Sequence, residues 1–123
     1  MDMDQFWHDV INQNAEALPA YFQPDARINW HCTNERFTVS EFIKANCEYP
    51  GAWAGEIERK YALEDLLVTV VRVYAKDRSS SFHVVSFIQL REGRIASVDE
   101  YWAEDGAAPQ WRLDRHIGTA IHP

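Results

Sequence analysis

The chain has 123 residues, 46% of them hydrophobic and 25% charged, which is the size and composition of one globular domain with one core. The net charge of −7, with twelve scattered Lys and Arg residues, argues against nucleic-acid binding, and no apolar run approaches the ~20 residues that would span a bilayer. The acidic start MDMDQFWHDV lacks the features of a secretory signal, so we expect a soluble, cytoplasmic protein that binds no membrane.

Two helices are expected at the N-terminus. Apolar residues at helical spacing predict an amphipathic helix over residues 3–18, with Asp4 capping its first turn. Pro19 ends this helix and suits the first turn of a short second helix that runs through Phe22. The sequence Gln23-Pro24-Asp25 then predicts a turn that leads into a strand.

This strand covers residues 26–33, and a third helix follows it. Thr38 or Ser40 can cap the helix, whose apolar spacing extends over residues 39–49 until Pro50-Gly51 stops it. We therefore expect three helices in the first half of the chain.

From residue 56 onward, β-branched and aromatic residues predict four strands that follow one another as antiparallel neighbours. They cover residues 56–63, 66–75, 81–90 and 94–103. Helices packed on one face of a curved antiparallel sheet give an α+β architecture in a single domain over residues 1–123. Residues 106–123 have little periodicity, and we expect this tail to wrap the body or a partner.

The order of elements, together with two segments, resembles the nuclear transport factor two-like superfamily, which includes ketosteroid isomerases, SnoaL-like polyketide cyclases and scytalone dehydratases. The segments are AYFQPDARINW, similar to the superfamily's helix-turn-strand entry, and GRIASVDEYW, similar to its final strand. The resemblance covers about the first 105 residues. It implies a cone-shaped sheet around a cavity closed by helices, and a homodimer formed through the outer sheet face.

Side chains alternate across a strand, so the resemblance also predicts which residues face the cavity. These are Ile28, Trp30, Thr69, Val71, Phe82, Val84, Ser86, Val98, Glu100 and Trp102. The positions that match the catalytic groups of ketosteroid isomerases are Phe6, Trp30 and Ser86. None carries the tyrosine or acids that the isomerisation needs, so that specific reaction is disfavoured.

Glu100 is the candidate catalytic residue. A carboxylate among Trp30, Trp102 and Val98 loses solvation, so its pKa should rise and it could shuttle a proton. The alternatives are that Glu100 pairs with Arg112 at the cavity edge or lies exposed. Arg112 could instead bind a ligand carboxylate or dock on another subunit.

The end of the third helix offers further ligand-binding candidates. Asn46 could hydrogen-bond a ligand carbonyl or simply cap the helix. Tyr49 and Trp53 flank Pro50-Gly51 and could form an aromatic lid over the cavity or an ordinary edge contact. With Trp30, Val84, Ser86, Val98, Trp102 and Arg112, these residues make up the expected ligand site.

Metal and cofactor sites are not expected. The five histidines show no HxH or HExxH spacing, and the five glycines form no GxGxxG motif. Cys32 and Cys47 lack a CxxC spacing and are expected to be buried thiols without a disulfide.

The residues that face away from the cavity are too apolar for a free surface and indicate a homodimer. They are Tyr74, His83, Val85, Phe87, Gln89 and Tyr101. The sequence therefore favours binding of a small hydrophobic molecule in an aromatic-lined pocket, with cofactor-independent lyase or isomerase chemistry of the cyclase or dehydratase kind. A ligand-binding module without catalysis and a dimeric interaction scaffold are the alternatives.

Overall fold

A computed structural model describes residues 1–123. Helix α1 (Met3–Ile11) is shorter than predicted and begins with a different cap. Its N-cap is Asp2, whose side chain accepts a hydrogen bond from the Gln5 amide at 3.0 Å, so the expectation for Asp4 was wrong. The helix ends early because Gln13 adopts a φ of 55°. The apolar spacing that suggested a longer helix continues into the short 3₁₀ helix η1 (Leu18–Tyr21), where Leu18 is fully buried.

Strand β1 (Phe22–Trp30) starts before the predicted strand and includes the proposed turn at residues 23–25. The pairing register shifts between Phe22 and Arg27, which accommodates Pro24, a residue without an amide hydrogen for the ladder. Strand β2 (Glu35–Phe37) was not predicted, because three residues carry too little pattern.

Helix α2 (Val39–Cys47) confirms the predicted cap. The Thr38 side chain accepts from the Glu41 amide, and the Glu41 carboxylate accepts from the Thr38 amide, which together form a capping box. The helix ends two residues before the predicted end.

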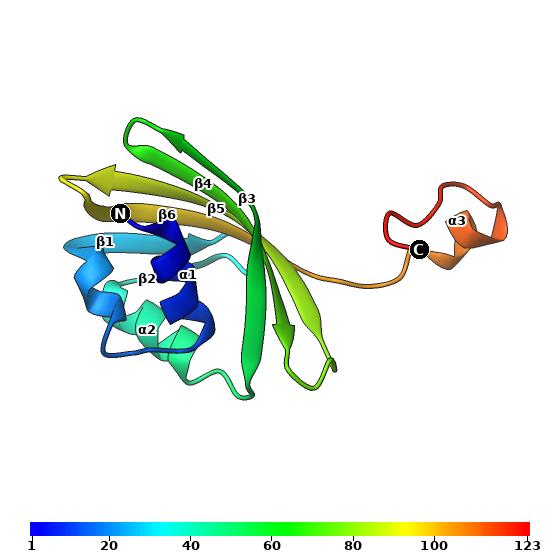
Figure 1. The fold of residues 1–123 in the computed structure, drawn as a ribbon, viewed down its shortest axis with the longest axis horizontal. Helices are drawn as coiled ribbons and strands as arrows, with labels where there is room; N and C mark the ends of the chain where they lie inside the picture. Colours follow the sequence, from blue (N-terminus) through cyan, green and yellow to red (C-terminus); the bar gives the residue numbers. More distant parts are fainter.

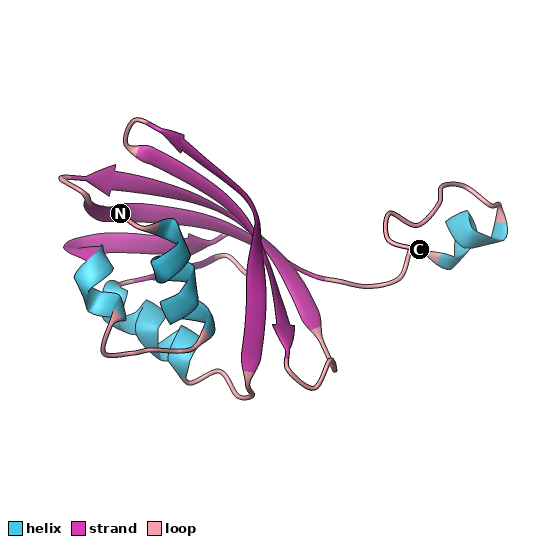
Figure 2. Cartoon of the chain, in the orientation of Figure 1, coloured by secondary structure: helices cyan, strands magenta, loops and turns pink.

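One six-stranded sheet carries the fold, in the order β2-β1-β6-β5-β4-β3. Its long strands are β3 (Trp53–Leu63), β4 (Leu66–Ala75), β5 (Ser81–Arg91) and β6 (Arg94–Glu104), which confirms the four predicted strands to within three residues at each end. All pairs are antiparallel except β1 with β6. Figures 1 and 2 show the sheet curving around α1, η1 and α2, which all lie on one face. This is the expected α+β architecture.

The core lies between the helices and the concave face of the sheet. Burial alternates along the whole of β4, as expected for a strand with one covered face. Trp7 anchors α1 in this core: it is 1% exposed, and its indole N–H donates to Thr69 Oγ1 at 3.1 Å. The predicted inward register is confirmed by the complete burial of Thr69, Val71, Val84 and Ser86.

The tail after Asp105 extends away from the body (Figure 1). Helix α3 (Gln110–Asp114) bonds only within the tail, for example from the Leu113 amide to the Pro109 carbonyl. The expected wrapping of the chain's own body is absent, because nothing after Asp105 hydrogen-bonds to the sheet or the helices.

Two remaining expectations concern single features. Both cysteines are free, but Cys32 is exposed and only Cys47 is partly buried, so the expectation of two buried thiols was wrong for Cys32. No helix combines the length and the apolar character that crossing a membrane requires.

Candidate functional site

A cavity of about 300 Å³ lies between the helices and the concave face of the sheet. Ten of its thirteen lining residues are hydrophobic, so its walls offer mainly dispersion contacts and few hydrogen bonds. The lining comes from the end of α1, the end of α2, the end of β1 and the adjoining ends of the long strands. The residues are Val10, Ile11, Gln13, Trp30, Cys32, Thr33, Ala45, Asn46, Tyr49, Trp53, Val73, Phe82 and Trp102.

Five aromatic rings form a continuous wall along this cavity. Neighbouring ring centroids are 5.5 Å apart for Tyr49 and Trp53, and 6.0 Å apart for Trp53 and Phe82. Phe82 and Trp102 are 6.3 Å apart, as are Trp102 and Trp30. Tyr49 is 53% exposed, so the wall runs from the surface inward. The predicted placement of Tyr49 and Trp53 at one site agrees with this geometry.

Amide side chains tie the two helix ends together at the cavity. Asn46 donates from Nδ2 to the Val10 carbonyl at 2.9 Å, while Gln13 donates to the carbonyls of Asn46 and Tyr49 at 2.9 and 2.8 Å. Asn46 is therefore neither a simple helix cap nor a free donor. Its side-chain oxygen accepts no hydrogen bond within the chain and is the atom available to a ligand.

Glu100 is a buried carboxyl group with three hydrogen-bond donors around it. It is 3% exposed. Oε1 accepts from the indole N–H groups of Trp30 at 3.0 Å and Trp102 at 3.3 Å, and Oε2 accepts from Ser86 Oγ at 2.5 Å. Burial raises the pKa of Glu100 above its ordinary value, and the bonds from Ser86, Trp102 and Trp30 only partly oppose this. No cation pairs with Glu100, so the expected alternative of a partnership with Arg112 is wrong.

The cavity wall stands between Glu100 and the cavity space. Glu100 is not among the lining residues, whereas Trp30 and Trp102, which hydrogen-bond it, are. Glu100 thus holds both indoles in place from behind. In this geometry it is a positioning residue for the aromatic wall.

The structure divides the predicted ligand site into three groups. Trp30, Asn46, Tyr49, Trp53 and Trp102 line the cavity together. Val84, Ser86 and Val98 are buried beneath it in the core and do not line it. Arg112 lies in the projecting tail, 5.5 Å from the Trp111 ring centroid, so its expected place at the pocket was wrong.

Sequence reasoning missed the cavity residues from helix ends and loops. On the helix side these residues are Val10 and Ile11 in the last turn of α1 and Gln13 just after it. On the sheet side they are Cys32 and Thr33 in the turn after β1. Periodicity places side chains within one element but not across two, so no signal in the sequence identified these contacts.

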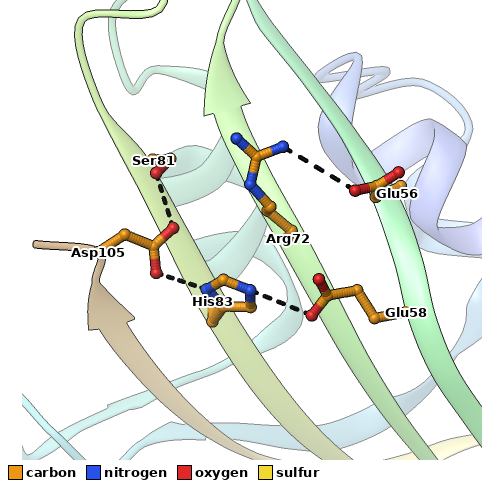
Figure 3. Close-up of polar contacts among 6 residues, drawn as sticks. All are labelled: Glu56, Glu58, Arg72, Ser81, His83 and Asp105. Carbon is orange, nitrogen blue, oxygen red and sulfur yellow. Dashed lines mark hydrogen bonds and ion pairs between the residues drawn. The ribbon is translucent and has the colours of Figure 1, made fainter. Parts of the chain in front are cut away.

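A second polar cluster lies on the outer sheet face, away from the cavity (Figure 3). His83 contacts Asp105 through Nδ1 and Glu58 through Nε2, the latter at 3.1 Å, and Ser81 Oγ donates to Asp105 at 2.6 Å. The hydrogen bond that His83 donates to the Asp105 carboxylate raises the pKa of His83. Burial alone would raise the pKa of Asp105, but the bonds from Ser81 and His83 outweigh it and lower that pKa. Nowhere do three His, Cys, Asp or Glu side chains converge in a way that could hold a metal ion.

Solved structures identify the fold as that of the nuclear transport factor two-like superfamily. A protein from Kribbella flavida assigned as a ketosteroid isomerase is 23% identical, with a TM-score of 0.77 over 98% of this chain and 87% of that one. A nuclear transport factor two-like protein of unknown function from Burkholderia xenovorans is 18% identical, with a TM-score of 0.75 over 91% and 88%. A protein from Shewanella putrefaciens assigned as a SnoaL-like polyketide cyclase is 13% identical, with a TM-score of 0.64 over 85% and 81%. No family model and no curated protein matches the sequence.

Proposed function

We propose that this chain binds a small, largely apolar organic molecule in the cavity between the helices and the curved sheet. The observation that carries this proposal is the lining itself, with ten hydrophobic residues of thirteen around about 300 Å³. Concave apolar sites with a few placed polar groups are typical of ligand-binding sites. Two of the similar structures are assigned as enzymes of small organic molecules, a ketosteroid isomerase and a polyketide cyclase, which supports the same use of the fold here.

The lining also suggests the class of ligand. The rings of Trp53, Phe82 and Trp102 offer stacking and edge contacts to a flat ring system. The free side-chain oxygen of Asn46 accepts a hydrogen bond, so a hydroxyl or amine on the ligand would pair with it. A planar aromatic or polycyclic molecule with one such donor fits these features best.

Binding can be tested with N-phenyl-1-naphthylamine, an apolar dye with one N–H donor, by energy transfer from the cavity tryptophans. Ala45→Phe places a ring in the cavity and is expected to weaken dye binding roughly tenfold or more, since that corresponds to only ~1.4 kcal/mol. Lys44→Phe adds the same ring at the neighbouring exposed position and should leave binding unchanged. Equal affinities for the two variants would contradict a ligand site in this cavity.

Proton transfer by Glu100 is a second candidate function. The observation that favours it is a carboxyl group with no cation partner, buried directly behind two cavity residues. A substrate would have to part the indoles of Trp30 and Trp102 to reach it. For a ligand recovered with the protein from its own cells, Glu100→Gln should then abolish turnover but spare dye binding, whereas a pure binding protein shows no turnover in either form.

We also infer a homodimer formed through the outer sheet face, in a cytoplasmic protein. The side chains that support this face are Tyr74, His83, Val85, Phe87, Gln89 and Tyr101. Phe87 and Tyr101 are 40% and 43% exposed and pack edge to face with centroids 6.2 Å apart. Helices cover only the opposite face (Figure 2), so a second copy is the partner that would remove these rings from water.

A further inference from the structure

The tail, residues 106–123, is an apolar arm without a partner in its own chain. Its large side chains Trp111, Leu113, Ile117 and Ile121 are 56%, 49%, 54% and 89% exposed. All four lie within 11 residues, and the arm extends clear of the body (Figure 1). Apolar side chains gathered in this way mark a contact surface.

The polar cluster of Figure 3 fixes where the arm leaves the body. The Asp105 amide donates to the Ser81 carbonyl at 2.9 Å, and the Asp105 side chain is held by Ser81 Oγ and by His83. Ser81 and His83 alternate with the inward-facing Phe82 and Val84, so both point to the outer face. The arm therefore starts from the outer face, where the homodimer partner is proposed to lie.

The arm is also poorly placed to return to its own body. Asp105 is held by three hydrogen bonds, and Pro109 restricts Ala108 to an extended backbone. Before Pro109, only Gly106 and Ala107 are left for a reversal of direction. A path outward needs no reversal.

Charge favours the acidic body of another molecule as the arm's docking surface. The arm carries Arg112, Arg115 and Asp114, a net charge of +1, so residues 1–105 carry −7 − 1 = −8. Opposite net charges bring the arm and a second body together, and the apolar side chains then supply the contact.

We propose that the arm packs on the sheet surface of a second copy of this chain, with the two copies exchanging arms reciprocally. This proposal rests on the inferred homodimer and goes beyond it, because it adds residues 106–123 to an interface that was inferred from the side chains of the sheet alone. The structural alignment with the Kribbella flavida protein covers 98% of the chain and so runs into the arm, which supports a defined path for this segment.

Photo-crosslinking of the full chain tests the exchange. p-Benzoylphenylalanine in place of Leu113 is irradiated in a mixture of ¹⁴N- and ¹⁵N-labelled chains, and crosslinked peptides are read by mass spectrometry. Crosslinks between differently labelled chains, joining the arm to residues 1–105, are the expected result. The same probe in place of Glu16, which is exposed beyond α1, should give none.

A second variant measures how much the arm contributes. The triple variant Trp111→Ser, Leu113→Ser, Ile117→Ser removes apolar surface that is exposed in the single chain. We therefore expect the variant to fold like the wild type. Sedimentation should show the dimer dissociation constant rising roughly tenfold or more.

Each outcome bears on one proposal. Two results would overturn the arm exchange without contradicting the homodimer. One is crosslinks that are confined to single chains. The other is a dimer that neither crosslinks through the arm nor weakens in the triple variant. A chain that sediments as a monomer at every concentration overturns both, while dye binding in the cavity is judged independently.

Discussion

The hydrogen bonding of the Glu100 carboxyl group involves three neighbouring side chains. Its Oε1 accepts two indole N–H groups, which can only donate, and Oε2 lies 2.5 Å from a serine hydroxyl, which can donate or accept. A protonated carboxyl satisfies the same three partners by donating to Ser86 Oγ. The arrangement therefore accommodates the neutral acid that burial favours.

This gives a pH dependence of stability with a definite sign. Because the pKa of Glu100 is raised in the folded state, its stabilising contribution is complete below its ordinary pKa of 4.5 and is lost as pH rises through the folded value. Glu100→Gln keeps the shape and does not titrate. Urea denaturation gives the free energy of unfolding of Glu100→Gln and of the wild type. The difference, variant minus wild type, should therefore be small at pH 4.5 and increase toward pH 9.

Asp9 provides the opposite trend in the same experiment. It is also buried, at 5% exposed, but the hydrogen bond from Tyr21 at 2.5 Å, aided by Asn14, lowers its pKa. Its contribution is present above the ordinary value of 3.8 and is lost as pH falls through the folded pKa. Asp9→Asn should thus become less stable relative to the wild type as pH rises from 3 to 5. Parallel pH trends in the two variants would refute these assignments.

At the scale of the element, β3 packs closely against both β4 and α1 at one residue, Gly55. A Cβ added at Gly55 would lie 2.6 Å from the Arg72 carbonyl oxygen and 2.8 Å from Ile11 Cδ1. The first of these atoms is backbone and cannot rotate away. Gly55→Ala should lower the free energy of unfolding by about 1–3 kcal/mol, the usual cost of overpacking.

Gly106→Ala is the matched control for this substitution. Nothing lies within 4 Å of the added carbon there, and the position has no positive φ. Its free energy of unfolding should stay within about 0.5 kcal/mol of the wild type. A similar loss in both variants would show that the close packing of β3 against β4 and α1 is not what excludes a side chain at Gly55.

The elements also show what the sequence can and cannot predict. Strand β4 was predicted to the residue, because nine of its ten residues are β-branched or apolar and the run lies between turns. The end of α1 was not, because Leu18 keeps the apolar spacing after the backbone has left the helix. The parallel pairing of β1 with β6 is a long-range contact that alternation within either strand cannot reveal.

The candidate site was predictable to the extent that it lies on one strand face. Alternation together with the resemblance placed Glu100, Trp30 and Trp102 on the same side, and they do hydrogen-bond. The alternation of side chains along a strand does not show how deeply each one is buried. Val84 and Ser86 were therefore expected at the cavity, but they lie beneath it. Arg112 was misplaced because the path of a tail without periodicity follows from tertiary contacts alone.

At the scale of the whole molecule, the question is what covers the outer sheet face. Phe87 and Tyr101 expose two neighbouring rings there. If a second copy covers them, a carboxylate at position 87 is buried without a partner and opposes association. Phe87→Asp should therefore raise the dimer dissociation constant in sedimentation roughly hundredfold.

The control for Phe87→Asp is a second exposed aromatic residue on the other side of the molecule. Tyr49 is 53% exposed and lies at the cavity, away from the outer face, so Tyr49→Asp adds the same charge without touching the proposed interface. It should leave the sedimentation of the dimer unchanged and alter only dye binding. Dissociation by both variants would point to a general effect of added negative charge on a chain already at −7, whereas dissociation by Phe87→Asp alone locates the contact on the outer face.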